Sequence, residues 1–206
     1  MPDAHPMPPP PLFFFTVFDT PMGGCALVWG ERGLVGVLLP EASDAATRSR
    51  VRRRYAGAQE AAPTPELQQV IDRIRALLNG ARDDLADIAL DLTEIPPFHR
   101  RVYELARAIR PGSTRSYGEI AIELGEPHAA RAVGQALGAN PFPIIVPCHR
   151  VLAAGGKAGG FSANGGITTK LRLLTIERAR TSDTPTLFDG DSTFGFAMRP
   201  RRRNSR

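Results

Sequence analysis

The sequence of 206 residues contains only two cysteines, Cys25 and Cys148, and four histidines. Two cysteines cannot form the disulfide framework that stabilises small secreted domains. The sequence has no Cys-x2-Cys pair and its histidines lack the spacing of metal ligands, so we expect no zinc site and no other metal. This scarcity of cysteine is typical of a reducing compartment, and we therefore expect a cytoplasmic location.

Long hydrophobic runs are also missing. The nearest is Leu12–Phe18, far short of the roughly 18 apolar residues that a membrane-spanning helix needs. No basic segment precedes this run, so we expect no secretory signal and no membrane association. Residues 1–11 include six prolines, and we expect them to form a disordered or extended leader.

Charge is distributed unevenly along the chain, whose net charge is +5. Residues 1–92 carry 9 basic and 12 acidic side chains, whereas residues 93–180 carry 12 basic and 6 acidic ones. Residues 181–206 add 5 basic and 3 acidic side chains. Because neutralised phosphates supply most non-specific affinity for nucleic acid, we expect a polyanion to bind the second half of the chain.

The first part of the chain has the pattern of a small α+β domain, which we place at residues 12–92. Short runs rich in aromatic and β-branched residues predict strands, two of them joined as a hairpin through Glu31–Gly33. Two longer runs with apolar residues at helical spacing predict helices. The predicted strands are Phe13–Phe18, Gly24–Gly30, Gly33–Leu39 and an extended Ile88–Leu92, and the predicted helices are Ala42–Tyr55 and Thr64–Asn79. No motif in this domain indicates a chemistry of its own.

Paired prolines, Pro96 and Pro97, separate this domain from a second one at residues 93–180. Residues 181–206 have few apolar side chains and contain the run Arg-Pro-Arg-Arg-Arg, so we expect a disordered basic tail. The first helix of the second domain has one apolar face, formed by Phe98, Val102, Leu105 and Ile109. The last helix, Thr168–Ala179, carries Leu171, Leu173, Leu174 and Ile176.

A pair of short helices lies between these two. Ser116 and Glu119 form a capping box that opens the first of them. Gly125 ends this helix and Pro127 begins the next. Two short helices joined by a tight turn that contains glycine are the pattern of a helix-turn-helix.

The segment before the last helix carries the candidate nucleophile. The apolar run Ile144–Val146 leads to Pro147, which lacks an N–H and fixes its φ, and then to Cys148. A thiol reacts as its thiolate, and a neighbouring imidazole or positive charge favours that form. His149 and Arg150 follow directly, although neighbours on an extended segment point in opposite directions. His149 would therefore act through a bend or a bridging water. The alternative is that Cys148 is a small buried hydrophobic residue without reactivity.

Five short motifs follow one another between Pro96 and Glu177. They are Ser116-Tyr-Gly-Glu-Ile-Ala, Ala129-Ala-Arg-Ala-Val-Gly134, Asn140-Pro141, Pro147-Cys-His-Arg-Val151 and Lys170-x-x-Leu-Leu-x-x-Glu177. In this order they resemble the O6-alkylguanine-DNA alkyltransferases, also called methylated-DNA–protein-cysteine methyltransferases. The family's fold implies an N-terminal RNase H-like α/β unit followed by a C-terminal winged-helix-like domain, whose helix-turn-helix accompanies the reactive cysteine.

The resemblance implies DNA repair by direct reversal. An O6-alkylguanine, in the first place O6-methylguanine, is flipped out of the DNA, and its alkyl group moves irreversibly to Cys148, once per molecule. The resemblance further implies that His149 activates Cys148 through a water and that Glu177 orients His149. Asn140 would brace the turn that bears the cysteine, and Tyr117 would rotate the target phosphate and hydrogen-bond the flipped base. No cofactor is implied, because the substrate carries its own leaving group.

The resemblance also implies how double-stranded DNA is bound. The helix-turn-helix would enter the minor groove, where Arg131 would fill the space that the flipped base leaves. Ala129, Ala130 and Gly134 would permit this close approach because their side chains are small. The protein would act as a monomer and lie with the nucleoid in the cytoplasm.

The pocket for the alkyl group is where the sequence departs from the family pattern. The backbone carbonyls of Val151 and Cys148 would accept hydrogen bonds from the guanine amino group, and the Ser162 N–H would face O6. The loop that leads to Glu177 is slightly longer than is common in the family, with Ala163-Asn164 as the extra residues, and Phe161 stands where many relatives have tyrosine. The implied pocket residues are Pro143, Val151, Phe161 and Ser162.

Other classes of function use parts of the same pattern. A lesion-binding module of the alkyltransferase-like kind would use the helix-turn-helix but lack the cysteine, whereas this chain has it. A cysteine hydrolase would use Cys148, His149 and Glu177 but would turn over repeatedly. A winged-helix regulator with an incidental cysteine is the third alternative. Within the tail, Pro185–Asp189 is a candidate motif for docking on a sliding clamp.

Overall fold

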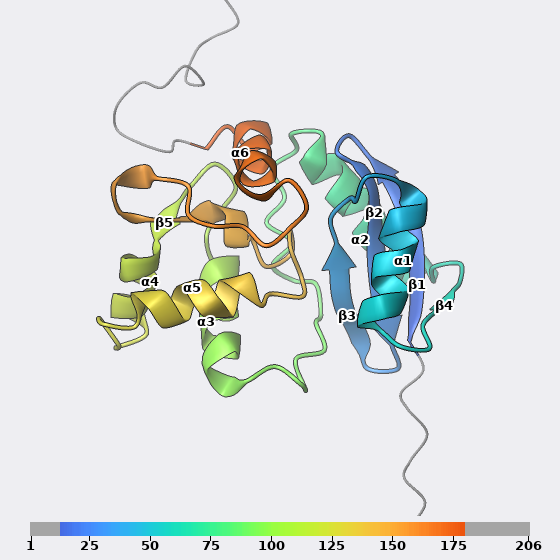
Figure 1. The fold of residues 1–206 in the computed structure, drawn as a ribbon, viewed down its shortest axis with the longest axis horizontal. Helices are drawn as coiled ribbons and strands as arrows, with labels where there is room; N and C mark the ends of the chain where they lie inside the picture. Colours follow the sequence, from blue (N-terminus) through green and yellow to red (C-terminus); the bar gives the residue numbers. More distant parts are fainter. Residues whose placement is uncertain (1–12, 180–206) are drawn as a thin grey trace, which may run out of the picture.

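The structure is a computed structural model that describes residues 13–179. The leader predicted at 1–11, the tail predicted at 181–206 and the docking motif within that tail lie outside the described residues. Figure 1 shows the first half of the chain, blue to cyan, beside the second half, green to orange, so the architecture is a mixed α+β one. Within residues 13–179, no helix has the length and apolar character to cross a membrane.

The first half of the chain is built on a four-stranded sheet. β1 (Phe14–Thr20), β2 (Gly23–Gly30) and β3 (Gly33–Leu38) form an antiparallel meander, in which the three strands and the β2–β3 hairpin were predicted and the pairing of β1 with β2 was not. Gly33 opens β3 with a φ of 118°, a conformation that favours glycine and permits the tight hairpin turn. A short β4 (Gln59–Glu60), which the sequence pattern does not predict, pairs in parallel with β1 and completes the order β3-β2-β1-β4.

Two helices cover opposite faces of this sheet. α1 (Asp44–Arg54) begins after Ser43 and α2 (Pro65–Leu78) after Thr64, and each of these N-cap hydroxyls accepts a backbone N–H. Since successive residues of a strand point to opposite faces, β2 supplies side chains to two clusters. The cluster on the α1 face contains Phe15, Ala26, Val28, Leu38, Val51 and Ala58. The cluster on the α2 face contains Cys25, Leu27, Ile71, Ile74 and Leu77 and continues into the second half of the chain.

Within the described residues, the second half contains four α-helices. α3 (Pro97–Arg107), α4 (Tyr117–Glu123) and α5 (Ala130–Gly138) pack against one another, and α6 (Gly166–Ile176) follows at the end of the described chain. The predicted capping box of α4 is present. The Ser116 hydroxyl accepts from the Glu119 N–H at 3.1 Å, while the Ser116 N–H donates to the Glu119 carboxylate at 2.6 Å.

Several predicted details of the second half are wrong. α5 begins at Ala130 and not at Pro127, because residues 127–129 form a turn. The predicted apolar face of α3, by contrast, is present, since Val102 and Ile109 are buried and the half-buried Phe98 and Leu105 pack against the same core, which Tyr103 and Ala106 also enter. α6 ends at Ile176, its Leu171 is exposed, and Lys170 is buried instead.

The segment predicted to be extended at Ile88–Leu92 contributes a single bridge, between Leu34 and Leu90.

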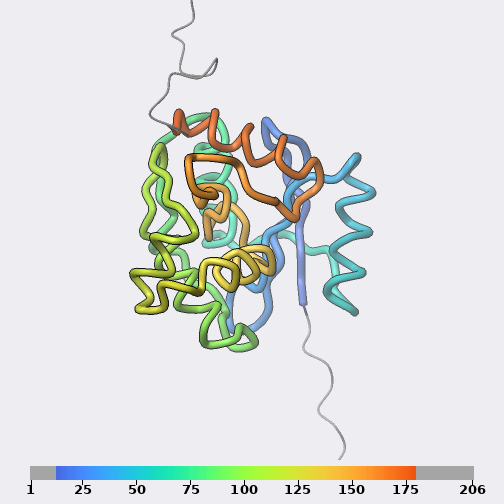
Figure 2. The backbone as a smooth tube through the Cα atoms, turned by 60° about the vertical axis from the view of Figure 1, so that its left-hand side comes forward, coloured from blue at the N-terminus to red at the C-terminus, as the bar shows by residue number. Residues whose placement is uncertain are grey.

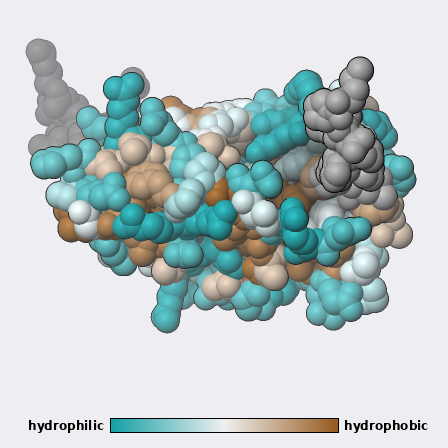
Figure 3. All heavy atoms as spheres, turned by 90° about the horizontal axis from the view of Figure 1, so that it is seen from below, coloured by the Kyte–Doolittle hydropathy of each residue, from teal (hydrophilic) through white to brown (hydrophobic). Residues whose placement is uncertain are grey.

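The two halves share one core. Buried side chains form a continuous cluster that runs from the sheet and α2 into α3, α4, α5 and α6. The chain that leaves α5 lies beside β3 (Figure 2), where the Val37 N–H donates to the Pro141 carbonyl at 2.9 Å. Figure 3 shows a face that hydrophilic side chains largely cover, with hydrophobic ones in smaller areas between them. Because β3 is an edge strand of the sheet, the hydrogen bond between Val37 and Pro141 holds the segment that leads to Cys148 against that edge.

Candidate active site

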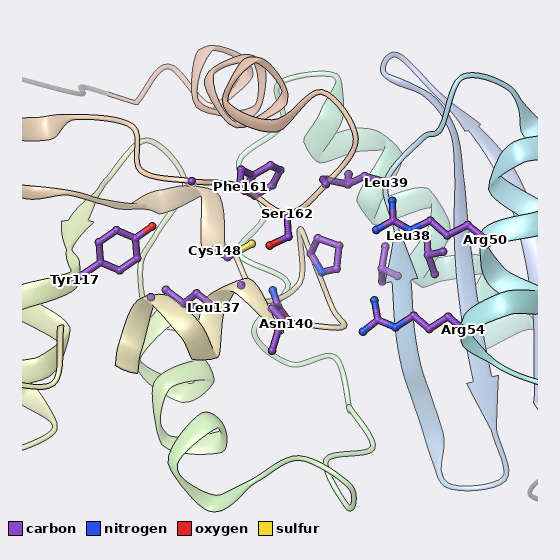
Figure 4. Close-up of a pocket in the computed structure, with 17 residues that line it drawn as sticks. Leu38, Leu39, Arg50, Arg54, Tyr117, Leu137, Asn140, Cys148, Phe161 and Ser162 are labelled. Carbon is purple, nitrogen blue, oxygen red and sulfur yellow. The ribbon is translucent and has the colours of Figure 1, made fainter. Parts of the chain in front are cut away.

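A pocket of about 190 Å³ lies at the junction of the two halves (Figure 4). Cys148 forms part of its wall, and only 8% of this residue is exposed. Seven of the residues predicted for the site line this pocket, namely Tyr117, Gly134, Asn140, Pro143, Cys148, Phe161 and Ser162. The opposite wall comes from the end of β3, the residue that follows it and α1, and contains Val37, Leu38, Leu39, Arg50 and Arg54.

Cys148 is presented by a bend in the chain. It opens the 3-10 turn η1 (Cys148–Arg150) directly after Pro147, so the chain bends at the thiol and is not extended there. Ile144, four residues before the cysteine, has a φ of 77°, which a β-branched residue rarely adopts. Such backbone strain persists only where surrounding contacts impose it, so the segment is held by its environment.

Asn140 supplies two of the contacts that hold this segment. Its Nδ2 donates to the Val146 carbonyl at 2.8 Å, and its Oδ1 accepts from the Phe142 N–H at 2.9 Å. The loop is closed further by the Val146 N–H, which donates to the Phe142 carbonyl at 2.7 Å. This geometry fits the bracing role that the sequence predicts for Asn140.

A buried cluster of three charged or titratable side chains lies behind the thiol. The Nε2 atom of His149 is 3.0 Å from Glu177 Oε1. Arg150 donates to the same carboxylate twice, from Nε to Oε2 at 2.9 Å and from Nη2 to Oε1 at 2.7 Å. Glu177 is the C-cap residue of α6, so the end of that helix fixes where its carboxylate lies.

The charge states of this cluster follow from its hydrogen bonds. Burial would raise the pKa of the Glu177 carboxyl, but the hydrogen bonds from His149 and Arg150 outweigh it and hold that pKa at about 2. Glu177 is therefore ionised at neutral pH and accepts the proton of His149 Nε2. Burial lowers the pKa of His149, which favours the neutral ring. Its Nδ1 is then an acceptor, and this buried atom has no hydrogen-bond partner among the described residues. Such an imidazole is able to take up a proton.

Lys170 is a site residue to which the sequence pattern assigns no role. A lysine on an amphipathic helix is by default exposed, yet Lys170 is fully buried, and only its place in the last motif marks it. Its Nζ donates to the Val151 carbonyl at 2.6 Å and lies 3.5 Å from the Tyr117 hydroxyl. Burial raises the pKa of the Cys148 thiol, and the hydrogen bond from Asn140 and the charge of Lys170 oppose this effect.

Tyr117 connects the pocket to the helix pair. It is the first residue of α4, and its half-buried ring packs against Gly134 of α5 on one side and Gly159 on the other. A Cβ atom at Gly159 would lie 3.0 Å from the Tyr117 hydroxyl oxygen, so a larger residue at position 159 would require the ring or the loop to shift.

The remaining predicted residues lie outside the pocket wall. Arg131 is exposed near the beginning of α5, and Ala129 and Ala130 are half-buried beside it. Gly134, one turn further along, does line the pocket, so α5 joins the outer surface to the site. Val151 is fully buried, and its carbonyl already accepts from Lys170.

Fold and site together define a mixed α+β protein with a thiol in the wall of a pocket and a buried histidine–carboxylate pair that begins at the next residue of the chain. The family model described as 6-O-methylguanine DNA methyltransferase, DNA binding domain, matches residues 97–179. The chain is 47% identical over 119 residues to the methylated-DNA–protein-cysteine methyltransferase of Mycobacterium tuberculosis H37Rv. The aligned residues cover 58% of this chain and 70% of the relative. It is 32% identical over 157 residues to the protein of the same name from Methanothermobacter thermautotrophicus, covering 76% of this chain and 81% of that one.

A solved structure extends this likeness to the fold. The crystal structure of Mycobacterium tuberculosis OGT in complex with DNA matches with a TM-score of 0.64 and 36% identity, over 80% of this chain and 92% of that one. The chain belongs to the methylated-DNA–protein-cysteine methyltransferase family.

Proposed function

We propose that the protein repairs DNA by direct reversal, moving the alkyl group of a flipped O6-alkylguanine to Cys148. The observation that carries this proposal is the arrangement around the thiol. Cys148 lines a pocket, and next to it in the chain lies His149, whose Nδ1 is unpaired among the described residues and whose Nε2 is fixed by Glu177. A nucleophile, a base and an orienting carboxylate are the components of nucleophilic catalysis.

The transfer balances without a cofactor. His149 takes the thiol proton, directly or through a water, and Cys148 Sγ attacks the alkyl carbon. The Sγ–C bond forms as the C–O6 bond breaks, and the electron pair of the broken bond stays with the guanine. The guanine takes up one proton and leaves neutral, with the Tyr117 hydroxyl as its donor. The product is a thioether, whose C–S bond breaks far less readily than the C–O6 bond of the alkylguanine. Each molecule therefore reacts once.

The helix pair α4–α5 is the element that we assign to DNA. Its exposed Arg131 is the side chain that would replace the flipped base from the minor groove. The small residues Ala129, Ala130 and Gly134 would allow α5 to approach the DNA closely. Flipping costs a few kcal/mol, and a weakened alkylguanine pair reduces that cost. We propose that the protein binds double-stranded DNA in this way as a monomer.

Two finer descriptions of the fold accompany this proposal. We assign residues 12–92 to an RNase H-like unit, for which the antiparallel meander with one parallel strand and helices on both faces gives support. We assign residues 93–180 to a winged-helix-like domain. The helix pair and the small parallel sheet of β5 (Arg115–Ser116) and β6 (Val151–Leu152) support this assignment.

The base itself would be recognised from the pocket wall. Ser162 and Phe161 belong to the loop before α6, and Pro143 belongs to the segment before Cys148. We assign the Ser162 N–H to guanine O6, and the Phe161 ring and Pro143 to contact with the alkyl group. The carbonyl of Val151 has a second lone pair beside the one that Lys170 occupies, and this would accept the guanine amino group.

Intact mass spectrometry with an oligonucleotide that contains O6-methylguanine tests the proposal. With excess oligonucleotide, the protein should gain the mass of one methyl group, located on Cys148 and not on Cys25. Cys25 is the matched control, since it is fully buried in the sheet and burial raises its pKa to about 12. Cys148→Ala should lose transfer and still bind DNA. Multiple turnover by the wild type, or transfer that survives in Cys148→Ala, would rule out the mechanism.

A further inference from the structure

The pocket wall that comes from the first half of the chain carries two guanidinium groups. Arg50 and Arg54 are one turn apart on α1, so they lie on the same face of the helix. Both line the pocket that contains Cys148, and Figure 4 shows them reaching toward it from the side opposite Tyr117. The transfer mechanism uses neither of them.

The two arginines differ in their partners. Arg50 forms an ion pair with Glu41 through Nη1, which holds its side chain in place. Arg54 lies above the Tyr55 ring, with 5.7 Å from Cζ to the ring centroid. Two further arginines of α1 pair with Glu60, whereas Arg54 has no carboxylate partner within the described part of the chain. Arg54 therefore presents an unneutralised positive charge at the pocket.

The rest of this wall is apolar, formed by Val37, Leu38 and Leu39. Such a wall suffices for a purely hydrocarbon substituent, which gains nothing from a guanidinium group. A guanidinium group instead matches the planar, two-oxygen geometry of a carboxylate. Because one pocket contains both Cys148 and the arginines, a substituent that extends past the thiol brings its far end toward this wall.

We propose that Arg50 and Arg54 form a carboxylate-binding wall, and that the protein accepts O6-substituents of guanine that end in a carboxylate. The inference rests on the proposed function and names a substrate class for it, of which O6-carboxymethylguanine is the simplest member. Cys148 Sγ attacks the methylene carbon, the Sγ–C bond forms and the C–O6 bond breaks. The electron pair of that bond stays with the guanine, which takes up one proton, and the carboxylate is unchanged. The product is S-carboxymethylcysteine.

The test compares two oligonucleotides that differ only in the O6-substituent. Rate constants for transfer from O6-carboxymethylguanine and from O6-methylguanine are measured with protein in excess, and their ratio is taken. Arg54→Gln should lower the carboxymethyl-to-methyl ratio about tenfold, which corresponds to ~1.4 kcal/mol. Arg53→Gln is the matched control, because it removes the same charge from the same helix at an exposed position outside the pocket wall. It should leave the ratio unchanged.

Free bases distinguish a carboxylate on the substituent from a phosphate of the DNA backbone. O6-(4-carboxybenzyl)guanine and O6-benzylguanine contain no phosphate, and Arg54→Gln should again lower the ratio of their rate constants. If the variant slows both oligonucleotides by the same factor and affects neither free base selectively, the arginines bind backbone phosphate and the inference is wrong. An unchanged ratio in both experiments overturns it as well. Failure of the proposed function itself looks different, since the wild type would then transfer no group to Cys148 from any of these substrates.

Discussion

Replacing Glu177 by glutamine removes the charge at the centre of the buried cluster and keeps the size of the side chain. The wild-type carboxylate accepts one hydrogen bond from His149 and two from Arg150, and all three side chains are almost fully inaccessible to solvent. In Glu177→Gln, Arg150 keeps its hydrogen bond to the Ile109 carbonyl at 2.6 Å but loses its only carboxylate partner among the described residues. The variant therefore leaves a buried guanidinium group without a counter-charge.

Two independent arguments give the size of the loss of stability in Glu177→Gln. Breaking a buried ion pair from one side costs about 3–5 kcal/mol. The pKa of Glu177 falls from an ordinary 4.5 to about 2 in the folded protein, which corresponds to about 3 kcal/mol of stability. We expect the free energy of unfolding of Glu177→Gln at neutral pH to be lower than that of the wild type by about this amount.

The pH dependence has a definite sign. A carboxyl group whose pKa is lowered on folding contributes its full stability above the pKa of the unfolded chain. That contribution is lost as the pH falls through 4.5 towards about 2, where the folded protein also takes up the proton. The stability difference between wild type and Glu177→Gln should therefore be constant near neutrality and shrink in acid.

Urea unfolding followed by the fluorescence of the single tryptophan, Trp29, measures these free energies. Glu123→Gln serves as the control, because Glu123 forms an exposed ion pair with Arg115 and its replacement should cost less than about 1 kcal/mol. A Glu177→Gln variant as stable as the control, or a deficit that persists unchanged in acid, would refute the reasoning.

Three further predictions concern activity. Arg131→Ala should slow transfer from duplex DNA about tenfold more than transfer from free O6-benzylguanine, because only the duplex has a stack to fill, and equal losses would contradict the assignment. Lys170→Met should move the rate–pH profile of transfer to higher pH, because a positive charge that lowers the pKa of Cys148 is lost, and an unmoved profile would show that Lys170 has no influence on the thiol. Removal of residues 181–206 should preserve transfer to the free base and reduce only the salt-dependent part of DNA affinity, so loss of transfer would show that the tail is part of the domain.

Local signals in the sequence predicted most of the elements. The meander of β1, β2 and β3 follows from short β-prone runs and turn glycines, and the beginning of α4 follows from its capping box. The beginning of α5 is misplaced because Pro127 suits a first helical position, whereas the chain uses it within a turn. β4 has only two residues and depends on pairing with β1, so no local pattern predicts it.

The site residues also divide into those that sequence motifs predict and those that depend on how the chain packs. Cys148, His149 and Glu177 stand in recognisable motifs, and the structure places His149 against Glu177 and Cys148 in the pocket wall. Arg50 and Arg54 lie in the part of the chain where the sequence shows no chemistry, and they reach the pocket only because β3 and α1 dock beside the segment before Cys148. The burial of Lys170 likewise depends on how α6 packs, which the spacing of its apolar residues does not determine.

The small exposed fraction of Cys148 bears on how long an unused molecule lasts. Oxidation to sulfenic acid and beyond requires an accessible thiolate, and burial opposes both accessibility and ionisation at this position. A sulfur atom that can react only once is lost when a soluble alkylating agent converts it to a thioether, or when peroxide oxidises it beyond the reversible sulfenic acid. Keeping it protonated and enclosed slows its reaction with every small electrophile in solution and so preserves the stock of competent molecules until damaged DNA arrives.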